Sequence, residues 1–205
     1  MFALNLANLG QYTDVVRLRT GAALSLRFAE PGDADALQDY FRSLSSSSRY
    51  NRLMGAAPEL PQTQLDKFVR AGEGGSYSVL ATVTVGDDDA IVGEARYAYQ
   101  AESASLEFGV SVDDRWHGNG IGAALLSNLE CRAAAFGACR LFGDTLRSNG
   151  AMLGLARKLG FSFSHTPGDW RQVRLEKPIL YAPKEIPCVS WRLAATAMPS
   201  PSTLR

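Results

Sequence analysis

The sequence lacks an excess of charge of either sign. Its 205 residues include 21 lysines and arginines and 21 aspartates and glutamates, so the formal net charge at pH 7 is zero. Nucleic acids and acidic membrane surfaces favour proteins with a basic surface, and this balance supports neither partner. No apolar run reaches the roughly 18 residues that indicate a membrane-spanning helix. We therefore expect no nucleic-acid partner and no membrane partner.

Cysteine is scarce, and its three positions are scattered. Cys131, Cys139 and Cys188 form neither a close pair nor a metal-ligand spacing. An odd, scattered set fits a reducing compartment better than a disulfide framework. The first twelve residues lack the basic segment with which a signal peptide begins. We expect unpaired cysteines, no metal and a cytoplasmic location.

The composition that is present indicates a globular protein with one domain. Apolar residues make up 46% of the chain and charged residues 20%, and a chain of this length can bury a substantial core without metal or disulfide. We divide it into an N-terminal extension (residues 1–22), one folded domain (23–176) and a proline-rich tail (177–205). The tail is expected to be partly irregular, with Trp191 as its one large anchor.

Hydrophobic periodicity predicts alternating strands and helices. The predicted strands lie at residues 23–29, 77–85, 91–99, 104–112, 139–146, 161–165 and 172–176. The predicted helices lie at about residues 33–44, 61–71, 120–136 and 149–159, and a serine run at 45–48 ends the first. Strands two to four form an antiparallel meander. The strand–helix–strand unit from 104 to 146 predicts one parallel pair, so the class is α/β (α+β) with a mixed sheet.

A glycine-rich turn joins the strand at 104–112 to the helix at 120–136. It lies within VDDRWHGNGIGAALL, residues 112–126, and places glycines at 118, 120 and 122. Glycine lets backbone N–H groups approach a ligand closely, and the first helical turn offers unpaired donors and the positive end of the helix dipole. The turn therefore predicts a pyrophosphate site. The same spacing also fits a turn that only packs the helix against the sheet.

Two nucleotide-binding motifs compete for this turn. A P-loop requires a lysine after its second glycine, and none follows here. The dinucleotide fingerprint is formally met by Gly118, Gly120 and Ala123, with Asp144 at the distance of a ribose ligand. Against it, residues 113–117 separate the strand from the first glycine, and no second βαβ half is visible. A dinucleotide-binding domain remains an alternative.

The turn resembles the acetyl-CoA motif of the GNAT superfamily of N-acetyltransferases, Arg/Gln-x-x-Gly-x-Gly/Ala at a strand-to-helix junction. The matching residues are His117, Gly118, Asn119, Gly120, Ile121 and Gly122. His117 stands where Arg or Gln is usual. The resemblance covers about residues 23–176, including a helix and Gly-Phe ending at 149–161 that are similar to those closing the family's CoA site. Residues 44–55 resemble a segment of the subgroup that includes bacterial protein-lysine acetyltransferases.

The resemblance implies a GNAT-like fold, with a mostly antiparallel central sheet, one parallel βαβ unit and about four flanking helices. It implies acetyl-CoA as cosubstrate, a small-molecule amine or a protein lysine as acceptor, and a possible homodimer. The residues that it assigns to acetyl-CoA are Val110, Val112, His117, Gly118, Asn119, Gly120, Gly122, Ala123 and Asn149. Asn149 is equally suited to capping the last helix.

For catalysis, the resemblance assigns the general base to Glu107, with Glu94 on the neighbouring strand as a second candidate. The family's tyrosine acid falls at Ala156, so water, Tyr97, Tyr99 or His165 would take its place. Arg49, Tyr50 and Arg52 are candidates for the acceptor site, although surface packing explains them as well. The missing tyrosine also leaves open a non-catalytic acyl-CoA sensor on the same fold.

Overall fold

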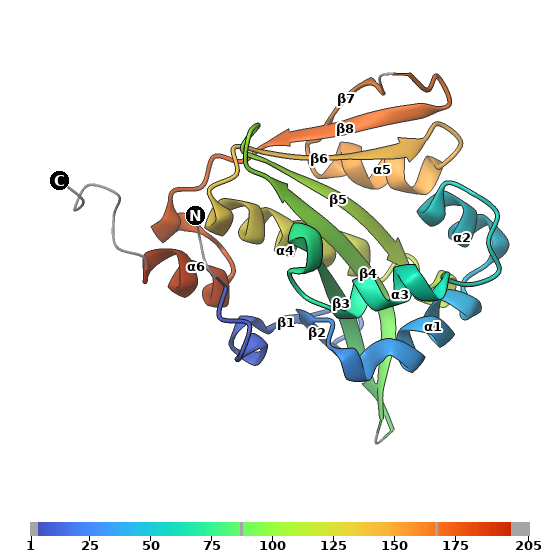
Figure 1. Cartoon of the computed structure of the whole chain (residues 1–205), viewed down its shortest axis with the longest axis horizontal. Helices are drawn as coiled ribbons and strands as arrows, with labels where there is room; N and C mark the ends of the chain where they lie inside the picture. Colours follow the sequence, from blue (N-terminus) through green and yellow to red (C-terminus); the bar gives the residue numbers. More distant parts are fainter. Residues whose placement is uncertain (1–3, 87, 167, 198–205) are drawn as a thin grey trace.

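The computed structural model describes residues 4–86, 88–166 and 168–197. Its centre is an eight-stranded sheet with the order β1-β2-β3-β4-β5-β6-β8-β7 (Figure 1). The strands are β1 Asp14–Arg17, β2 Ala23–Phe28, β3 Ser76–Val85, β4 Asp88–Gln100, β5 Ser105–Val112, β6 Arg140–Leu146, β7 Ser162–His165 and β8 Gln172–Pro178. The helices are α1 Ala34–Ser43, α2 Ser46–Leu53, α3 Gln62–Val69, α4 Ile121–Phe136, α5 Gly150–Lys158 and α6 Val189–Thr196.

The sheet is mixed, as the sequence predicts. β3, β4 and β5 form the expected antiparallel meander, and β5 and β6 form a parallel pair around the crossover helix α4. The pairs β1–β2, β2–β3, β6–β8 and β7–β8 are antiparallel. The fold class inferred from the sequence is therefore confirmed.

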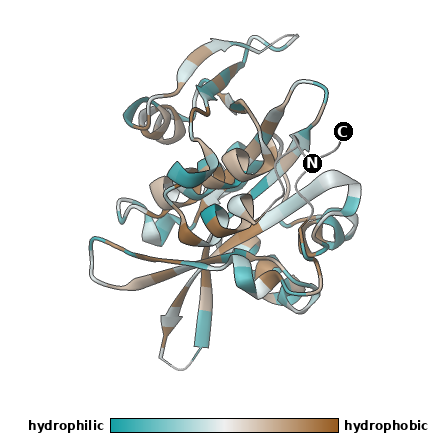
Figure 2. Ribbon diagram, turned by 90° about the vertical axis from the view of Figure 1, so that its left-hand side faces the viewer, coloured by the Kyte–Doolittle hydropathy of each residue, from teal (hydrophilic) through white to brown (hydrophobic). Residues whose placement is uncertain are grey.

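Helices cover both faces of the sheet. On one face, α1 reaches β5 through a hydrogen bond between the Tyr40 hydroxyl and Ser111 Oγ (2.9 Å), and an apolar cluster joins α1 and α3. On the other face, α4 packs so closely on β4 that a Cβ on Gly93 would lie 3.2 Å from Ile121 and Leu125. Apolar residues line the middle of the molecule and polar residues its edges (Figure 2).

Both terminal segments add to this core. β1 extends the sheet beyond β2, and α6 packs against α4 with Trp191 fully buried. Trp191 is thus the anchor that the sequence predicts. No helix in the described part of the chain is long and apolar enough to cross a membrane.

The expectation of unpaired cysteines is wrong. Cys131 on α4 and Cys188 at the start of α6 form a disulfide with a Cα–Cα distance of 5.9 Å, and only Cys139 is free. The two cysteines lie 57 positions apart in sequence. They meet because α6 folds back onto α4, and sequence spacing alone does not reveal such a contact.

The serine run contains a helix that sequence periodicity did not indicate. α1 ends at Ser43, and only two residues separate it from the start of α2 at Ser46. Ser45 Oγ accepts the backbone N–H of Ser48 at 3.1 Å, which satisfies a donor that the first turn leaves open. The serines therefore end one helix and cap the next.

Candidate active site

An opening in the sheet forms where β5 and β6 separate. The two strands pair only at residues 105–107 and 140–142, although both continue beyond these positions. They approach closely just past the last pair, since a Cβ on Gly143 would lie 2.6 Å from the Phe108 carbonyl oxygen. Beyond this point the strands diverge. The unpaired half of β5 borders two cavities, and that of β6 borders the first of them.

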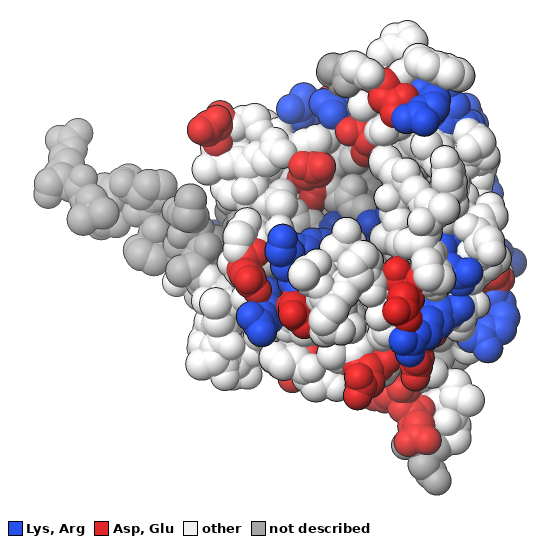
Figure 3. Space-filling model, turned by 45° about the vertical axis from the view of Figure 1, so that its right-hand side comes forward, with Lys and Arg blue, Asp and Glu red and all other residues white. Residues whose placement is uncertain are grey.

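We call the first the polar cavity. It has a volume of about 450 Å³ and lies on the sheet face that carries α2 and α3. In Figure 3, basic and acidic side chains surround a hollow on this face. Its polar lining consists of Asn51, Arg52, Ser76, Arg96, Glu107, Asp144, Thr145, Asn149 and Gln172.

The second is the turn-side cavity, of about 430 Å³, which lies against the glycine turn and the start of α4. The two cavities share the residues Asn51, Arg52, Val110, Asn149 and Met152. They are therefore neighbouring parts of one opening that leads from the glycine turn, past β5, to the polar cavity.

The backbone of the glycine turn is shaped for an anion. Gly118 and Gly120 have φ values of +79° and +92°, which side chains disfavour, and Gly120 is the N-cap of α4. The N–H groups of residues 118–123 donate to no residue that the structure describes. Six backbone donors at a helix N-terminus form a cradle for phosphate oxygens. At Gly122 a Cβ would lie 2.9 Å from Leu155 Cδ2, so this position is tightly enclosed.

The structure brings most of the predicted acetyl-CoA residues together. Those that line the turn-side cavity are Val110, Val112, His117, Gly118, Gly120, Gly122, Ala123 and Asn149. The exception is Asn119, whose Nδ2 donates to the Trp116 carbonyl at 3.3 Å. Its side chain stabilises the turn from within.

Side chains at the turn bind the protein itself. His117 Nε2 lies 2.9 Å from the Val112 carbonyl oxygen, which ties the turn to the end of β5. Arg115 forms an ion pair with Asp113 at 2.6 Å and lowers the pKa of that carboxyl. The groups of the turn that remain free to contact an anion are therefore its backbone N–H groups.

Asn149 acts as the N-cap of α5. Its Oδ1 accepts the Met152 N–H at 3.1 Å, and its Nδ2 donates to Thr145 Oγ1 at 3.2 Å. Of the two roles that the sequence allowed, capping is the one present in the structure. The contact with Thr145 also joins α5 to β6 beside the opening.

Glu107 lies in the polar cavity at the point where β5 and β6 begin to part. Its side chain is exposed, and Oε2 accepts a hydrogen bond from Gln100 Nε2 at 2.9 Å. Glu107 forms no ion pair with any residue in the described ranges. It is an accessible carboxylate with free acceptor capacity.

Glu94, the second candidate base, has a different environment. It is completely buried, and its two carboxylate oxygens accept from Nε and Nη2 of Arg52. Ser111 Oγ donates to it as well, at 3.0 Å. Glu94 lines neither cavity, so its role in this arrangement is to hold Arg52.

Arg52 in turn occupies the junction of the two cavities. It crosses β5 at Gly109, where a Cβ would lie 2.9 Å from Arg52 Nη1. The register between β4 and β5 is regular, so β5 has no bulge at Gly109. The missing Cβ of Gly109 instead leaves room for the side chain of Arg52. Arg49 and Tyr50, the other acceptor-site candidates on α2, line neither cavity.

Of the candidate general acids, Tyr97 alone is among the residues that line the two cavities, and its hydroxyl lies on the opposite face of the sheet. Burial raises the pKa of Tyr97 to about 12, and its hydroxyl accepts from Arg132 on the opposite face of the sheet. Tyr99 packs on Phe136, and His165 hydrogen-bonds Arg147. Ala156 is fully buried. In the described structure, none of these four positions places a proton-donating group in the cavities.

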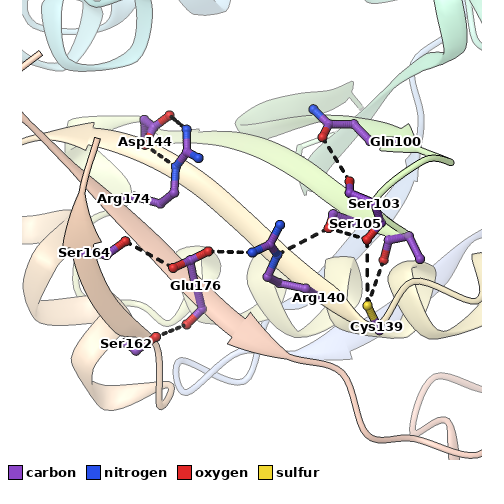
Figure 4. Close-up of polar contacts among 11 residues, drawn as sticks. Gln100, Ser103, Ser105, Cys139, Arg140, Asp144, Ser162, Ser164, Arg174 and Glu176 are labelled. Atoms are coloured by element: carbon purple, nitrogen blue, oxygen red, sulfur yellow. Dashed lines mark hydrogen bonds and ion pairs between the residues drawn. The ribbon is translucent and has the colours of Figure 1, made fainter. Parts of the chain in front are cut away.

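Asp144 is unsuited to binding a ribose. Both of its oxygens accept from Arg174, at 3.0 and 2.8 Å (Figure 4). Oδ1 also accepts from Thr166 Oγ1 at 2.8 Å. The described sheet has one parallel pair only, whereas a dinucleotide fold needs two βαβ halves. The structure thus removes the support for the dinucleotide alternative. The described residues also contain no group of three or more His, Cys, Asp or Glu side chains that could hold a metal ion.

Known acetyltransferases are similar to this chain in sequence and in fold. An acetyltransferase of Pseudomonas aeruginosa is 27% identical over 159 residues, which cover 78% of this chain and 86% of the relative. The structure of the GNAT domain of S. lividans PAT matches with a TM-score of 0.74 and 23% identity, over 82% of this chain and 97% of that one.

A cAMP-binding acyltransferase from Mycobacterium smegmatis also shares the fold, with a TM-score of 0.58 and 21% identity. The match covers 93% of this chain but only 56% of that protein. The model of the acetyltransferase (GNAT) family matches residues 37–161, more than half of the sequence. The chain therefore belongs to the GNAT acetyltransferase family.

Proposed function

We propose that this protein transfers an acetyl group from acetyl-CoA to a primary amine, by direct attack of the amine on the thioester. The observation that carries the proposal is the opening at the separated halves of β5 and β6. Unpaired backbone donors lie at one end of it, and an accessible carboxylate lies at the other. Two substrates entering from opposite sides would meet beside Val110.

Acetyl-CoA would bind in the turn-side cavity. The N–H groups of residues 118–123 are suited to its pyrophosphate, because a helix N-terminus with glycine turns offers donors and positive potential. The backbone around Val110 and Val112 is suited to the pantetheine arm and the acetyl carbonyl. Asn149, His117 and Asn119 would stabilise the walls of this site through the contacts that they make within the protein.

The amine would bind in the polar cavity as an ammonium ion and lose a proton to Glu107, directly or through water. The amine nitrogen then forms a bond to the acetyl carbon, the carbon–sulfur bond breaks so that CoA leaves as a thiolate, and the nitrogen gives up its second proton to water to yield the amide. A thiol pKa near 8.5 makes this a fair leaving group without a protein acid. The lack of the family's tyrosine acid, whose place is taken by Ala156, is therefore compatible with turnover.

Two measurements test the proposal. Acetyl-CoA should raise the melting temperature of the protein, and CoA thiol should be released when amines from several classes are supplied. Gly122→Leu should abolish both effects, because the new side chain would fill the enclosed space beside Leu155. Gly154→Leu offers a control on α5, where a Cβ meets no atom within 4 Å. No melting shift with millimolar acetyl-CoA would overturn the proposal.

The same data separate the enzyme from a non-catalytic acyl-CoA sensor, an alternative that the lack of a tyrosine acid at Ala156 leaves open. A sensor would show the melting shift but no thiol release with any amine or peptide.

A further inference from the structure

The polar cavity has four charged side chains in its lining, and two of them are already neutralised. Arg52 forms an ion pair with the buried Glu94 through two hydrogen bonds. Asp144 forms an ion pair with Arg174 in the same two-pronged manner. These two pairs need no further counter-charge.

The other two charged groups are Arg96 and Glu107. Neither forms an ion pair with a residue in the part of the chain that the structure describes. They lie on the same face of the sheet, because Arg96 pairs with Gly109 and the next position of that face, Ala98, pairs with Glu107. Among the described residues, the cavity thus contains one cation and one anion that form no ion pair with the protein.

Arg96 lies in a surrounding that makes its unpaired charge costly. It is half-buried on β4, and its guanidinium stacks on the Phe68 ring at 4.8 Å. Arg52 lies over the same ring at 5.5 Å. Burial and the neighbouring charge of Arg52 lower the pKa of Arg96. The exposed carboxylate of Glu73 acts on Arg96 from a distance and raises its pKa slightly against these effects. Glu73 Oε2 already lies 3.9 Å from Arg70 Nη1, with which it forms an ion pair.

Two guanidiniums therefore share one ring and a single adjacent carboxylate, Glu94. The local excess of one positive charge around the Phe68 ring, at a partly desolvated end of the cavity, favours a ligand group with one negative charge there. A carboxylate supplies that charge, whereas a phosphate dianion would reverse the imbalance.

We infer that the acceptor is a small amine that also carries a carboxylate, with its carboxylate on Arg96 and its ammonium group at Glu107. This inference rests on the proposed acetyl transfer and narrows its substrate class to amino acids in the broad sense. A cavity of about 450 Å³ accommodates a molecule of this size. A lysine side chain in a protein has no carboxylate of its own to offer Arg96.

The test compares matched pairs of acceptors with the full chain and saturating acetyl-CoA. Glycine, β-alanine, 4-aminobutyrate, 6-aminohexanoate and L-alanine are each paired with the corresponding primary amide, and a lysine-containing peptide is included. Thiol release is measured at initial rate. For at least one pair we expect kcat/KM to be more than about tenfold higher for the carboxylate, since hydrogen bonds to a charged partner are the stronger ones. The spacing of the preferred acceptor then reports the distance between the two sites.

Arg96→Gln should remove this preference and lower kcat/KM for the carboxylate about 10- to 100-fold, while KM for acetyl-CoA stays the same. Arg96→Lys, which keeps the charge, should retain part of the preference. Arg140→Gln is the matched control, because Arg140 lies on the same sheet but is paired with Glu176 at 3.0 Å and does not line the cavity. It should behave as the wild-type protein.

Equal rates for carboxylates and amides in every pair, or transfer to the peptide alone, would overturn the inference and leave the proposed acetyl transfer intact. A lack of any acetyl-CoA-induced melting shift would overturn both. Because the pairs are compared in the wild-type protein, the inference stays testable even if the Arg96 variants fold poorly.

Discussion

Replacing Glu94 and Glu107 separately by glutamine should separate a structural carboxylate from a catalytic one. Glu94 is completely buried and is the one carboxylate that Arg52 contacts through two hydrogen bonds. Removing its charge leaves the largely buried guanidinium of Arg52 without a counter-ion. Breaking a buried pair in this way costs about 3–5 kcal/mol. In a domain of about 200 residues, that corresponds to a fall in Tm of roughly 6–20 °C.

Glu107→Gln should have the opposite effects. Its side chain is exposed, and its one side-chain hydrogen bond among the described residues is with Gln100, so the free energy of unfolding should change by no more than about 0.5 kcal/mol. As the proposed base, however, it should contribute a factor of about 10²–10⁴ to turnover. Acetyl-CoA binding should be unaffected, because Glu107 does not line the turn-side cavity.

The assay combines thermal melts with calorimetric titration of acetyl-CoA and initial rates of thiol release. The titration and the rates are measured at a temperature where both variants are folded. Glu59→Gln serves as a surface control, since Glu59 is half exposed and pairs with Arg42 at 2.6 Å. A Glu94 variant that melts with the wild-type protein would refute the structural role. A Glu107 variant with unchanged turnover across the pH range would refute the catalytic one.

Three further results are expected. Cys188→Ser removes the disulfide to Cys131. Because this disulfide closes a 57-residue span, we expect the free energy of unfolding to fall by about 4 kcal/mol, seen as a lower urea midpoint. Three titratable thiols in the native protein would contradict the disulfide. Gly122→Leu should abolish the acetyl-CoA melting shift while the circular dichroism spectrum stays native, and a retained shift would place CoA elsewhere. Burial raises the pKa of Tyr97 to about 12, above an unfolded value near 10, so its contribution to stability is complete below about pH 10 and is lost as the pH rises toward 12. Tyr97→Phe should show a shallower alkaline decline, and identical slopes would rule out this residue as the cause.

Local patterns were enough to predict much of the fold. The meander of β3, β4 and β5 follows from alternating residues and turns, and α4 follows from an apolar stripe between Gly120 and Gly137. The glycine turn was visible as well, because its positive φ values and its place at a helix N-terminus depend on neighbours in the chain. The same local signal supported the family assignment, which the match over residues 37–161 establishes.

Features that depend on distant contacts were not predictable in this way. β1 and α6 belong to the core because β1 pairs with β2 and α6 packs on α4, and apart from Trp191 nothing near them in sequence indicates it. The disulfide was missed for the same reason. α2 was missed because its serines are poor helix formers, and its stability comes from a cap at Ser45 and its place against β5.

The sequence by itself thus determines where the glycine turn and β5 lie in the fold, since local spacing specifies where backbone donors and carboxylates occur along the chain. Only the tertiary structure decided what these groups do together. It buried Glu94 against Arg52 and left Glu107 exposed in the polar cavity. It also placed Arg96 in that cavity with no ion-pair partner among the described residues. The physical reason is that charge and burial depend on which groups from other elements lie nearby, and the folded sheet alone brings α2, β4, β5 and β6 to one opening.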